Sequence, residues 1–389
     1  MLYFDHNATT FVLPEVAEFV ADALCEVPGN ASSIHGLGQR ARQELEKARR
    51  TLASELGAAP GEVVFTSGGT ESNNLALFGV ARRFQGRRAH VVTTTIEHPA
   101  VLEACRQLES EGVDVTRVEV DSDGLVDSDA VARAIRDETV LVTVMHANNE
   151  VGTIQPIRGI ADAVLARRER GQEIYLHSDG VQAFGKIPFE VCALGVHLYS
   201  ISAHKVYAPK GTGALYVRKG VALASTIVGG RHEGGRRAGT ENVVGTMAFA
   251  KAVKLLDRNA PARVAALRDE LERQILSSEL QAEINGSRAP RLPNTTSVYF
   301  PGVSAENLVI ALDLKGIAVS TGSACSSGSL EPSHVLLAMG RTREEARSSV
   351  RISLGAYQST DDIRQLSETL LPLVARLQSA KGVRVRVAV

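Results

Sequence analysis

Strand-like segments alternate with helical stretches through the first two thirds of this 389-residue chain. The strand candidates are short runs rich in β-branched and aromatic residues, at 62–66, 90–94, 140–145, 173–177, 197–201 and 213–218. Such alternation is typical of a largely parallel sheet that helices cover on both faces. Ligands of an open α/β sheet bind outside the carboxyl ends of its strands. We therefore expect an α/β fold whose site lies where the polar residues that follow each strand come together.

The residue composition and spacing pattern of the chain change after about residue 245. A long stretch from Gly245 to Leu280 is rich in Ala, Leu, Arg and Glu at helical spacing, which predicts a helical connection into a second unit. From Asn294 onward, the strand-like segments TTSVYF and ISLG occur with intervening helical segments. We expect a smaller α+β domain in this part of the chain.

Net charge and cysteine spacing exclude several classes of protein. The formal net charge of −1 gives no electrostatic reason to expect nucleic acid or an anionic membrane as a partner. The N-terminus lacks the pattern of a secretory signal, and no apolar run approaches membrane-spanning length. The four cysteines, at 25, 105, 192 and 325, form no CxxC pair, which argues against a disulfide framework and a zinc site. We expect a cytoplasmic protein without a bound metal.

The segment YSISAHKVYAPKG, from 199 to 211, carries the most informative lysine of the chain. Lys205 follows a β-like run directly and lies in a polar turn, flanked by Ser202 and His204. This setting suits an amine that forms a Schiff base while neighbouring groups hold a phosphate, and it suggests pyridoxal phosphate as cofactor. Taken alone, the same segment is more often a surface lysine in a turn.

The Gly-rich segment TSGGTESNN, at 66–74, opens a predicted helix. Backbone N–H groups near Gly69 and Thr70 can hold a phosphate there, helped by the Thr70 hydroxyl and the helix dipole. The alternative is an ordinary helix N-cap made by Ser67 or Thr70, with no ligand.

Two further strand exits carry side chains suited to a cofactor site. His98 in IEHPAV can lie over an aromatic ring or move protons, although a lone loop histidine is more often structural. Asn148 and Asn149 in HANNEVG can donate and accept hydrogen bonds, although such pairs usually make turns.

Asp179 in HSDGVQ gives a stronger signal, because an acid at a buried strand end is costly unless it is paired. It can meet a protonated pyridine nitrogen and keep the cofactor an electron sink. Gln182, about one helical turn later, can reach the phenolic oxygen of the ring. The alternative for Asp179 is an ordinary helix N-cap.

Taken together, the motifs resemble those of cysteine desulfurases of the NifS/IscS type, which are fold-type I pyridoxal phosphate enzymes in the class V aminotransferase family. The motifs occur in the family's order along nearly the whole chain: DHNATT, GNASSIHGLGQRAR, TSGGTESNN, EHPAV, HANNEVGT, HSDGVQAFGK, SAHKVYAPKG, GGRHEGGRRAGTEN, STGSACSSGSLEPSHV and SSVRISLG. The resemblance implies a mostly parallel, seven-stranded-type sheet in a large cofactor-binding domain at 13–256. It also implies a smaller α+β domain made of 1–12 and 257–389.

The resemblance also assigns roles to individual residues. Lys205 would be the Schiff-base lysine, Asp179 the partner of the pyridine nitrogen, His98 the ring-stacking and catalytic residue, and Gln182 the phenolate contact. The phosphate would be bound by Gly69, Thr70, Ser202 and His204. Thr240 of the RAGT motif would reach the phosphate of the neighbouring subunit, which implies a homodimer. Asn149 would contact the cofactor, and Asn7, Asn149 and Arg351 would hold the carboxylate of the substrate L-cysteine.

Cys325 decides the chemistry within that family. It lies in STGSACSSGS, a run of small residues that we expect to form a mobile loop at about 320–332. Freed Lys205 would remove the α-proton of the substrate, and the Cys325 thiolate would attack the substrate sulfur to leave a persulfide and alanine. His98 or a nearby cation would assist deprotonation of the thiol.

A buried, unreactive thiol is the alternative for Cys325, and Cys325 is also a candidate transient ligand of an iron-sulfur cluster. The other three cysteines lie in apolar or helical patterns, and we assign them to packing: Cys25, Cys105 and Cys192.

The expected partner is an iron-sulfur scaffold or another sulfur-acceptor protein. Related alternatives are a selenocysteine lyase or a C–S lyase in which Cys325 is secondary, and a different class is a non-catalytic scaffold with the same fold. Gly180 stands where relatives generally have Ala, Ala31 replaces a common Pro, and the C-terminus lacks a recognisable scaffold-docking tail. These departures leave the identity of the acceptor open.

Overall fold

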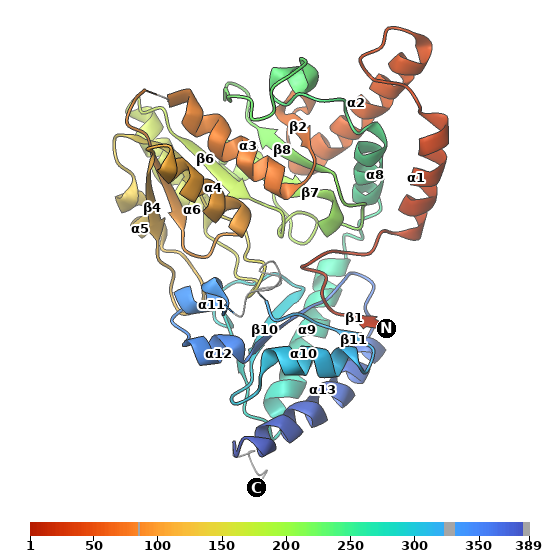
Figure 1. Cartoon of the computed structure of the whole chain (residues 1–389), viewed down its shortest axis with the longest axis vertical. Coiled ribbons are helices and arrows are strands. Elements are labelled where there is room, and N and C mark those ends of the chain that lie inside the picture. The colour runs from red at the N-terminus through yellow and green to blue at the C-terminus, as the bar shows by residue number, and fades with distance from the viewer. Residues whose placement is uncertain (85, 323–330, 384–389) are drawn as a thin grey trace.

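A seven-stranded sheet forms the centre of the larger part of the molecule (Figure 1). The computed structural model describes residues 1–84, 86–322 and 331–383. The sheet strands are β2 (Val63–Thr66), β3 (His90–Thr94), β4 (Asp114–Val118), β5 (Thr139–Thr143), β6 (Tyr175–Asp179), β7 (Leu198–Ser202) and β8 (Gly213–Val217). Their order is β2-β8-β7-β6-β5-β3-β4, and β8 alone among them runs antiparallel to its neighbours. This confirms the predicted mostly parallel sheet.

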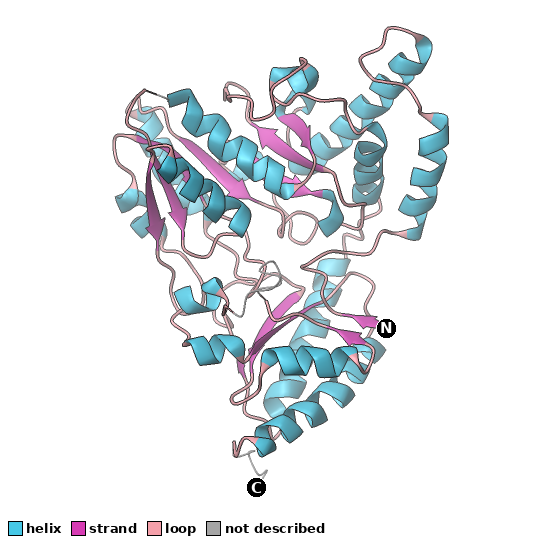
Figure 2. Ribbon diagram, in the orientation of Figure 1, coloured by secondary structure: helices cyan, strands magenta, loops and turns pink. Residues whose placement is uncertain are grey.

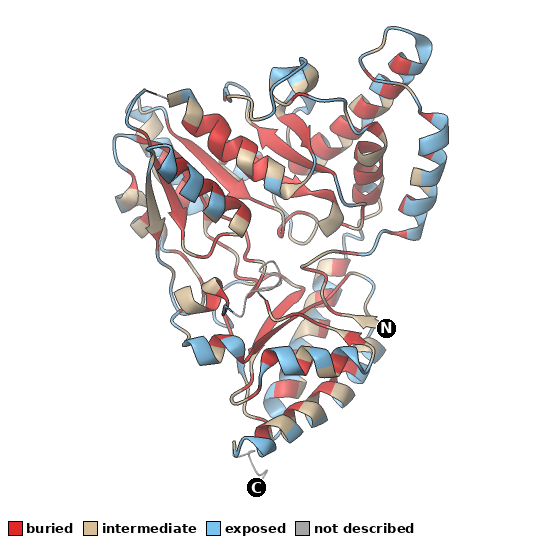
Figure 3. Cartoon of the chain, in the orientation of Figure 1, coloured by how far each residue is buried: buried red, intermediate tan, exposed pale blue. Residues whose placement is uncertain are grey.

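Helices cover both faces of this sheet (Figure 2). On one face lie α3 (Gly69–Ala81) and α4 (Pro99–Ser110), and on the other lie α1 (Pro14–Glu26), α2 (Gly36–Leu56), α5 (Ser128–Ala134), α6 (Ile157–Glu169), α7 (Val191–Leu194) and α8 (Val243–Lys254). Neighbouring strand residues face opposite sides: Leu141 of β5 packs in the α3/α4 cluster, whereas Val142 packs in the other cluster. Both faces are therefore apolar, and every strand of this sheet except the edge strand β4 is buried throughout, as Figure 3 shows.

Most of the remaining elements pack around a separate apolar cluster that includes Phe4, whereas Val335, Leu336 and Ala346 pack in another cluster with Ile96 and Met145. The strands are β1 (Leu2–Tyr3), β9 (Glu283–Ile284), β10 (Thr295–Tyr299), β11 (Ile317–Ala318) and β12 (Ser349–Ser353). The order β12-β10-β9 forms an antiparallel sheet, and β1 pairs with β11 in parallel. The helices are α9 (Ala260–Ser277), α10 (Ala305–Asp313), α11 (His334–Ala338), α12 (Arg343–Arg347) and α13 (Thr360–Ala380). The N-terminal strand is thus built into the C-terminal part of the chain.

Short 3₁₀ helices complete the described elements, at Pro60–Glu62, Arg82–Phe84, Ala203–Lys205 and His232–Gly235. No helix within the described residues is both long and apolar enough to span a membrane.

The sequence analysis missed one strand and did not predict a break in one helical stretch. The edge strand β4 was not predicted from the sequence, and it is largely half-exposed, so it lacks a strong apolar pattern. The helical stretch predicted from 245 to 280 is two helices, α8 and α9. The chain turns between them at Asp257, whose carboxylate accepts a hydrogen bond from the backbone N–H of Asn259, and Pro261 in the first turn of α9 has no N–H to continue a helix.

Candidate active site

One cavity of about 330 Å³ lies beyond the carboxyl ends of the central strands. Nearly all the residues predicted to form the site line it: Asn7, Gly69, Thr70, His98, Asn149, Asp179, Gln182, Ser202, His204, Lys205 and Arg351. Thr240 does not line this cavity and is exposed on the single chain. Cys325 lies outside the described residues.

Lys205 reaches the cavity because β7 ends at Ser202 and a single 3₁₀ turn follows. Its Nζ donates hydrogen bonds to the backbone carbonyl oxygens of Asn7 at 2.5 Å and Ala8 at 2.7 Å. The N-terminal segment therefore holds the amine at the edge of the cavity.

Asp179 is the last residue of β6 and is 6% exposed. Its carboxylate accepts hydrogen bonds from Asn73 Nδ2 at 2.6 Å and from the backbone N–H of Val181 at 3.0 Å. A buried carboxylate held by two neutral donors favours a cationic partner in the cavity, such as a protonated pyridine nitrogen. Asn73, on α3, was not singled out in the sequence, although it lies within the Gly-rich motif.

His98 is the N-cap of α4, and its Nδ1 accepts a hydrogen bond from the backbone N–H of Ala100 at 3.1 Å. An accepting Nδ1 carries no proton, so the neutral ring carries its proton on Nε2. Burial lowers the pKa of His98, while the charge of Asp179 opposes that shift and Lys205 adds to it. A neutral ring suits a residue that lies against an aromatic cofactor.

The start of α3 forms a cradle for an anion. A Cβ at Gly69 would lie 2.7 Å from Cγ2 of Val181, so glycine permits the close approach of the helix end to the segment after β6. Ser202 Oγ is buried at the cavity wall and has no hydrogen-bond partner among the described residues. A buried hydroxyl of this kind needs a partner, and a phosphate at the positive end of α3 would supply one. The donors present therefore fit pyridoxal phosphate.

His204 lies beside this cradle. Its Nδ1 is 3.1 Å from Thr9 Oγ1, and burial, with smaller contributions from nearby lysines, lowers the pKa of His204 to about 4. A phosphate beside the ring would raise that pKa again.

Arg351 lies in the wall contributed by β12 and is 3% exposed. Its Nη2 forms an ion pair with Asp5 at 2.6 Å, and its Nη1 donates to the carbonyl oxygen of Asn149 at 3.0 Å. Its Nε has no hydrogen-bond partner among the described residues. The guanidinium is thus fixed in place, and its Nε–H remains available to an anion.

Asn7 is more deeply built into the fold than the sequence indicated. Its Nδ2 donates to the carbonyl oxygen of Asn149 at 3.1 Å and to Thr295 Oγ1 at 2.8 Å, so both amide protons are used within the protein. The role of Asn7 in binding substrate stays a prediction.

Several residues near the site were missed in the sequence. Lys186 is half-buried and donates to Gln182 and Asn7, and Asp5 pairs with Arg351. Glu150 is buried and accepts a hydrogen bond from Ser333 Oγ at 2.5 Å. All three lie within the motifs DHNATT, HANNEVGT and HSDGVQAFGK, but each has a partner that is distant in sequence: Arg351 for Asp5, Ser333 for Glu150 and Asn7 for Lys186.

The assignment of three cysteines to packing was correct for Cys105 alone. Cys105 is fully buried on α4, whereas Cys25 and Cys192 are exposed. Among the described residues, no group of three or more His, Cys, Asp or Glu side chains is arranged to hold a metal.

The family model for class-V aminotransferases matches residues 2–366. The chain belongs to the class-V aminotransferase family. It is 44% identical over 382 residues to a protein of Dictyoglomus turgidum named cysteine desulfurase IscS, a match that covers 97% of this chain and 95% of that relative. Family membership confirms the predicted fold class and the dependence on pyridoxal phosphate.

Solved structures of class-V relatives share the whole architecture. A NifS-like protein superposes with a TM-score of 0.88 at 38% identity, covering 96% of this chain and 99% of that one. The structure described as SspA in complex with cysteine superposes with a TM-score of 0.83 at 36% identity, covering 92% and 100% of the two chains. The resemblance to cysteine desulfurases that the motifs indicated is therefore confirmed.

Proposed function

We propose that this chain is a pyridoxal-phosphate-dependent cysteine desulfurase that converts L-cysteine to L-alanine and passes the sulfur to Cys325 as a persulfide. One observation carries the proposal: Lys205, Asp179, His98 and the unpartnered hydroxyl of Ser202 all line a single cavity. The match to a desulfurase along nearly the full length of the chain supports it.

We infer how the cavity residues would hold the cofactor. Asp179 would face the pyridine nitrogen, Gln182 the phenolic oxygen, and His98 the ring. Gly69, Thr70, Ser202 and His204 would bind the phosphate. When bound, pyridoxal phosphate withdraws electron density from the α-carbon of an amino acid joined to it.

Lys205 would move the proton. Its amine donates hydrogen bonds to two backbone carbonyl oxygens. A neutral amine can keep both of these bonds with its two N–H groups, so its lone pair stays available to accept a proton. Once displaced by the substrate amine, Lys205 would accept the α-proton of cysteine. Arg351 would fix the substrate carboxylate, because its guanidinium is already oriented by Asp5 and Asn149. Asn149 and Asn7 would complete that subsite.

Cys325 would accept the sulfur. Its thiolate attacks the sulfur of the substrate, an S–S bond forms, and the bond between that sulfur and the substrate β-carbon breaks with its electron pair left on carbon. Protonation of the β-carbon then gives the methyl group of alanine. The persulfide would pass to an iron-sulfur scaffold or another acceptor protein in the cytoplasm.

The enzyme would act as a homodimer. Thr240 does not line the cavity of its own chain, so we propose that it binds the cofactor phosphate in the neighbouring subunit. A shared site would make assembly a condition of activity.

Two variants test this function. Cys325→Ala should retain the visible absorbance of the bound cofactor and lose alanine production from L-cysteine, whereas Lys205→Ala should lose both. Cys25→Ala, an exposed thiol far from the cavity lining, is the matched control and should behave as the unaltered chain does. Normal alanine and sulfide production by Cys325→Ala would contradict the persulfide route and favour a C–S lyase. Selenide release from selenocysteine without the thiol would favour a selenocysteine lyase.

A further inference from the structure

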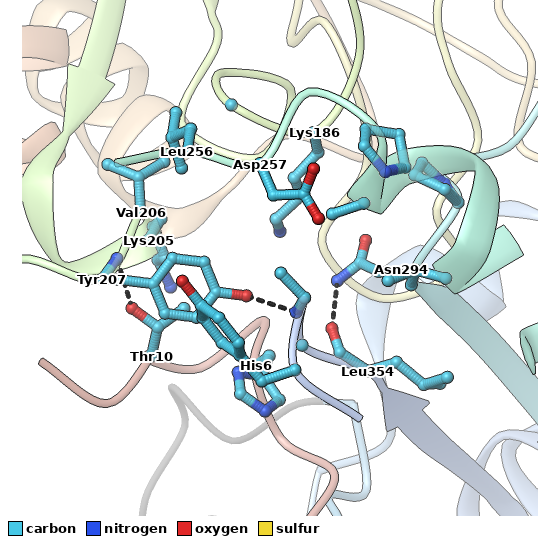
Figure 4. Close-up of a pocket in the computed structure, with 18 residues that line it drawn as sticks. His6, Thr10, Lys186, Lys205, Val206, Tyr207, Leu256, Asp257, Asn294 and Leu354 are labelled. Carbon is cyan, nitrogen blue, oxygen red and sulfur yellow. Dashed lines mark hydrogen bonds between the residues drawn. The ribbon is translucent and has the colours of Figure 1, made fainter. Parts of the chain in front are cut away.

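Lys186 is a half-buried lysine that the reaction described above does not use. It lies in the turn segment that follows β6. Its side chain lines a second, smaller cavity of about 40 Å³, which Lys205 also lines. Figure 4 shows the two lysines entering this region from different segments, with Asn294 and Leu354 on the opposite wall. Burial first, and then the charges of Lys205 and Arg351, hold the pKa of Lys186 well below its ordinary value. Such a group is costly to bury, so its hydrogen bonds matter.

Lys186 makes its contacts with side-chain amide oxygens. Its Nζ donates to Oε1 of Gln182 at 2.6 Å and to Oδ1 of Asn7 at 3.0 Å. The amide of Asn7 is also fixed by other groups, because Asn294 Nδ2 donates to the same Oδ1 at 3.0 Å. Among the described residues, the hydrogen bond to Oε1 of Gln182 comes from Lys186.

The amide of Gln182 has one oxygen and one NH₂ group, and the two ends present opposite hydrogen-bonding properties. With its oxygen on Lys186, its Nε2 donates to the carbonyl oxygen of Asn7 at 3.0 Å and retains a second proton at the cavity wall. If the amide were reversed, its oxygen would face the carbonyl oxygen of Asn7. It would also present an acceptor to any negatively charged oxygen in the cavity.

We propose that Lys186 is a positioning residue that holds the Gln182 amide with its NH₂ group toward the cofactor cavity. This proposal rests on the proposed function, because Gln182 acts there as the contact to the phenolic oxygen of pyridoxal phosphate. Lys186 itself touches neither the cofactor nor the substrate, and works through Gln182.

The test compares Lys186→Met, which keeps the length of the side chain and removes the donor, with Lys254→Met, an exposed lysine on α8. Each protein is loaded with pyridoxal phosphate, and its visible absorbance is recorded across pH before any substrate is added. The Lys186→Met spectrum should shift in band position or in its pH midpoint, and the Lys254→Met spectrum should not. We also expect kcat to fall about tenfold in Lys186→Met, with a smaller change in KM, because one buried hydrogen bond that orients the site is lost.

A double-mutant cycle separates positioning from a general structural effect. In a Gln182→Leu background, adding Lys186→Met should leave the band position and pH midpoint unchanged and should lower kcat by no more than about twofold. This is expected because the effects of residues that act through one another are not additive. Fully additive losses, or an unchanged spectrum in Lys186→Met, would overturn the proposal. If Lys186→Met does not fold, the fallback variant is Lys186→Gln, which retains an N–H donor and should keep the unaltered spectrum. A shifted spectrum in folded Lys186→Gln would also overturn the proposal. If the unaltered chain forms no alanine, the proposed function fails, while the absorbance of the loaded protein still decides the role of Lys186.

Discussion

At the scale of single residues, the site depends on small side chains as much as on reactive ones. Gly180 follows Asp179, and a Cβ at this position would overlap the ring of Tyr199. Tyr199 is fully buried, and its hydroxyl lies 2.7 Å from Nδ1 of His146. The glycine that departs from the usual family pattern is thus matched to a large aromatic residue on the neighbouring strand.

Gly180→Ala should therefore destabilise the fold by about 1–3 kcal/mol or more, since a methyl group forced into a packed interior displaces its neighbours. Urea unfolding followed by circular dichroism measures the change. Gly36→Ala is the matched control, because a Cβ at Gly36 meets no atom within 4 Å. Equal stabilities for the two variants would show that Tyr199 does not restrict position 180.

Reactive residues were predictable from the sequence where a single segment carried the signal. Asp179 ends strand β6, and Lys205 lies in the single turn after β7, so the placement of both could be inferred from local order. Asp5 could not, because its importance lies in an ion pair with Arg351 that the folded chain alone creates. Lys186 is close to Gln182 in sequence, but its contact with Asn7, 179 positions away, likewise depends on the fold. The propensity of a residue says nothing about a partner 346 positions away.

At the scale of elements, the ends of strands and the starts of helices position the residues of the site. β6 and β7 end at Asp179 and Ser202, and α3 and α4 begin at Gly69 and Pro99. These elements were predicted because buried parallel strands form continuous apolar runs that polar residues terminate. The break between α8 and α9 was not, because the Ala-, Leu- and Arg-rich composition continues across it.

The residues that flank 323–330 are tied to the site by specific contacts. Arg351 Nη1 lies 3.4 Å from the carbonyl oxygen of Gly322, and its backbone pairs with that of Ser320. After the flanked segment, Ser333 donates to the buried carboxylate of Glu150 and also caps α11. The described residues on the two sides of 323–330 are thus each held by a buried charged side chain, Arg351 on one side and Glu150 on the other.

Ser333→Ala should lower the rate of persulfide formation on Cys325 about tenfold, because it leaves the Glu150 carboxylate without its hydroxyl donor and frees the start of α11. Single-turnover measurement of the persulfide checks this, with cofactor absorbance expected to stay unchanged. Ser304→Ala is the matched control, since Ser304 caps α10 in the same way away from the cavity. Equal persulfide rates in the two variants would remove Ser333 from this role.

At the scale of the whole molecule, buried neutral histidines make the fold sensitive to acid. Burial lowers the pKa of His177 to about 3 and that of His146 to about 4. Between those values and about 6.5, the unfolded chain binds protons at these positions and the folded chain does not. Their contribution to stability is therefore complete above about pH 6.5 and is lost as the pH falls toward 3 to 4.

The free energy of unfolding of the cofactor-free protein should fall on acidification below pH 6.5, by up to ~1.4 kcal/mol per pH unit for each such histidine. His177→Asn should reduce that slope, whereas His35→Asn, at an exposed position, should leave it as it is. Chemical unfolding at a series of pH values measures both. A slope in His177→Asn equal to that of the unaltered chain would contradict burial of a neutral ring.

Assembly is the property of the molecule that a single chain reveals least. The proposed contribution of Thr240 to the neighbouring site predicts complementation between two inactive variants. When Lys205→Ala and Thr240→Ala chains are unfolded together and reassembled, hybrid dimers should each contain one intact site. Random pairing of the two chains should then restore about a quarter of full activity.

No recovery from that mixture, in dimers that have exchanged subunits, would place Thr240 in the site of its own chain or outside it. Local sequence patterns after about residue 245 predicted a second unit, but neither the dimer nor the proposed bounds of 13–256 and the remainder followed from them. Both came from the resemblance to a family, because association and domain packing depend on surfaces distributed along the whole chain.

The central claim is that sulfur leaves L-cysteine by transfer to Cys325. The most direct measurement is peptide-resolved mass spectrometry of the purified chain after reaction with L-cysteine, with alanine quantified in the same sample. Peptide resolution is needed because Cys25 and Cys192 are also exposed. We predict a gain of one sulfur atom on the Cys325 peptide, matched by alanine in the first turnover and absent from Cys325→Ala. Alanine formed without sulfur on Cys325 would contradict the account.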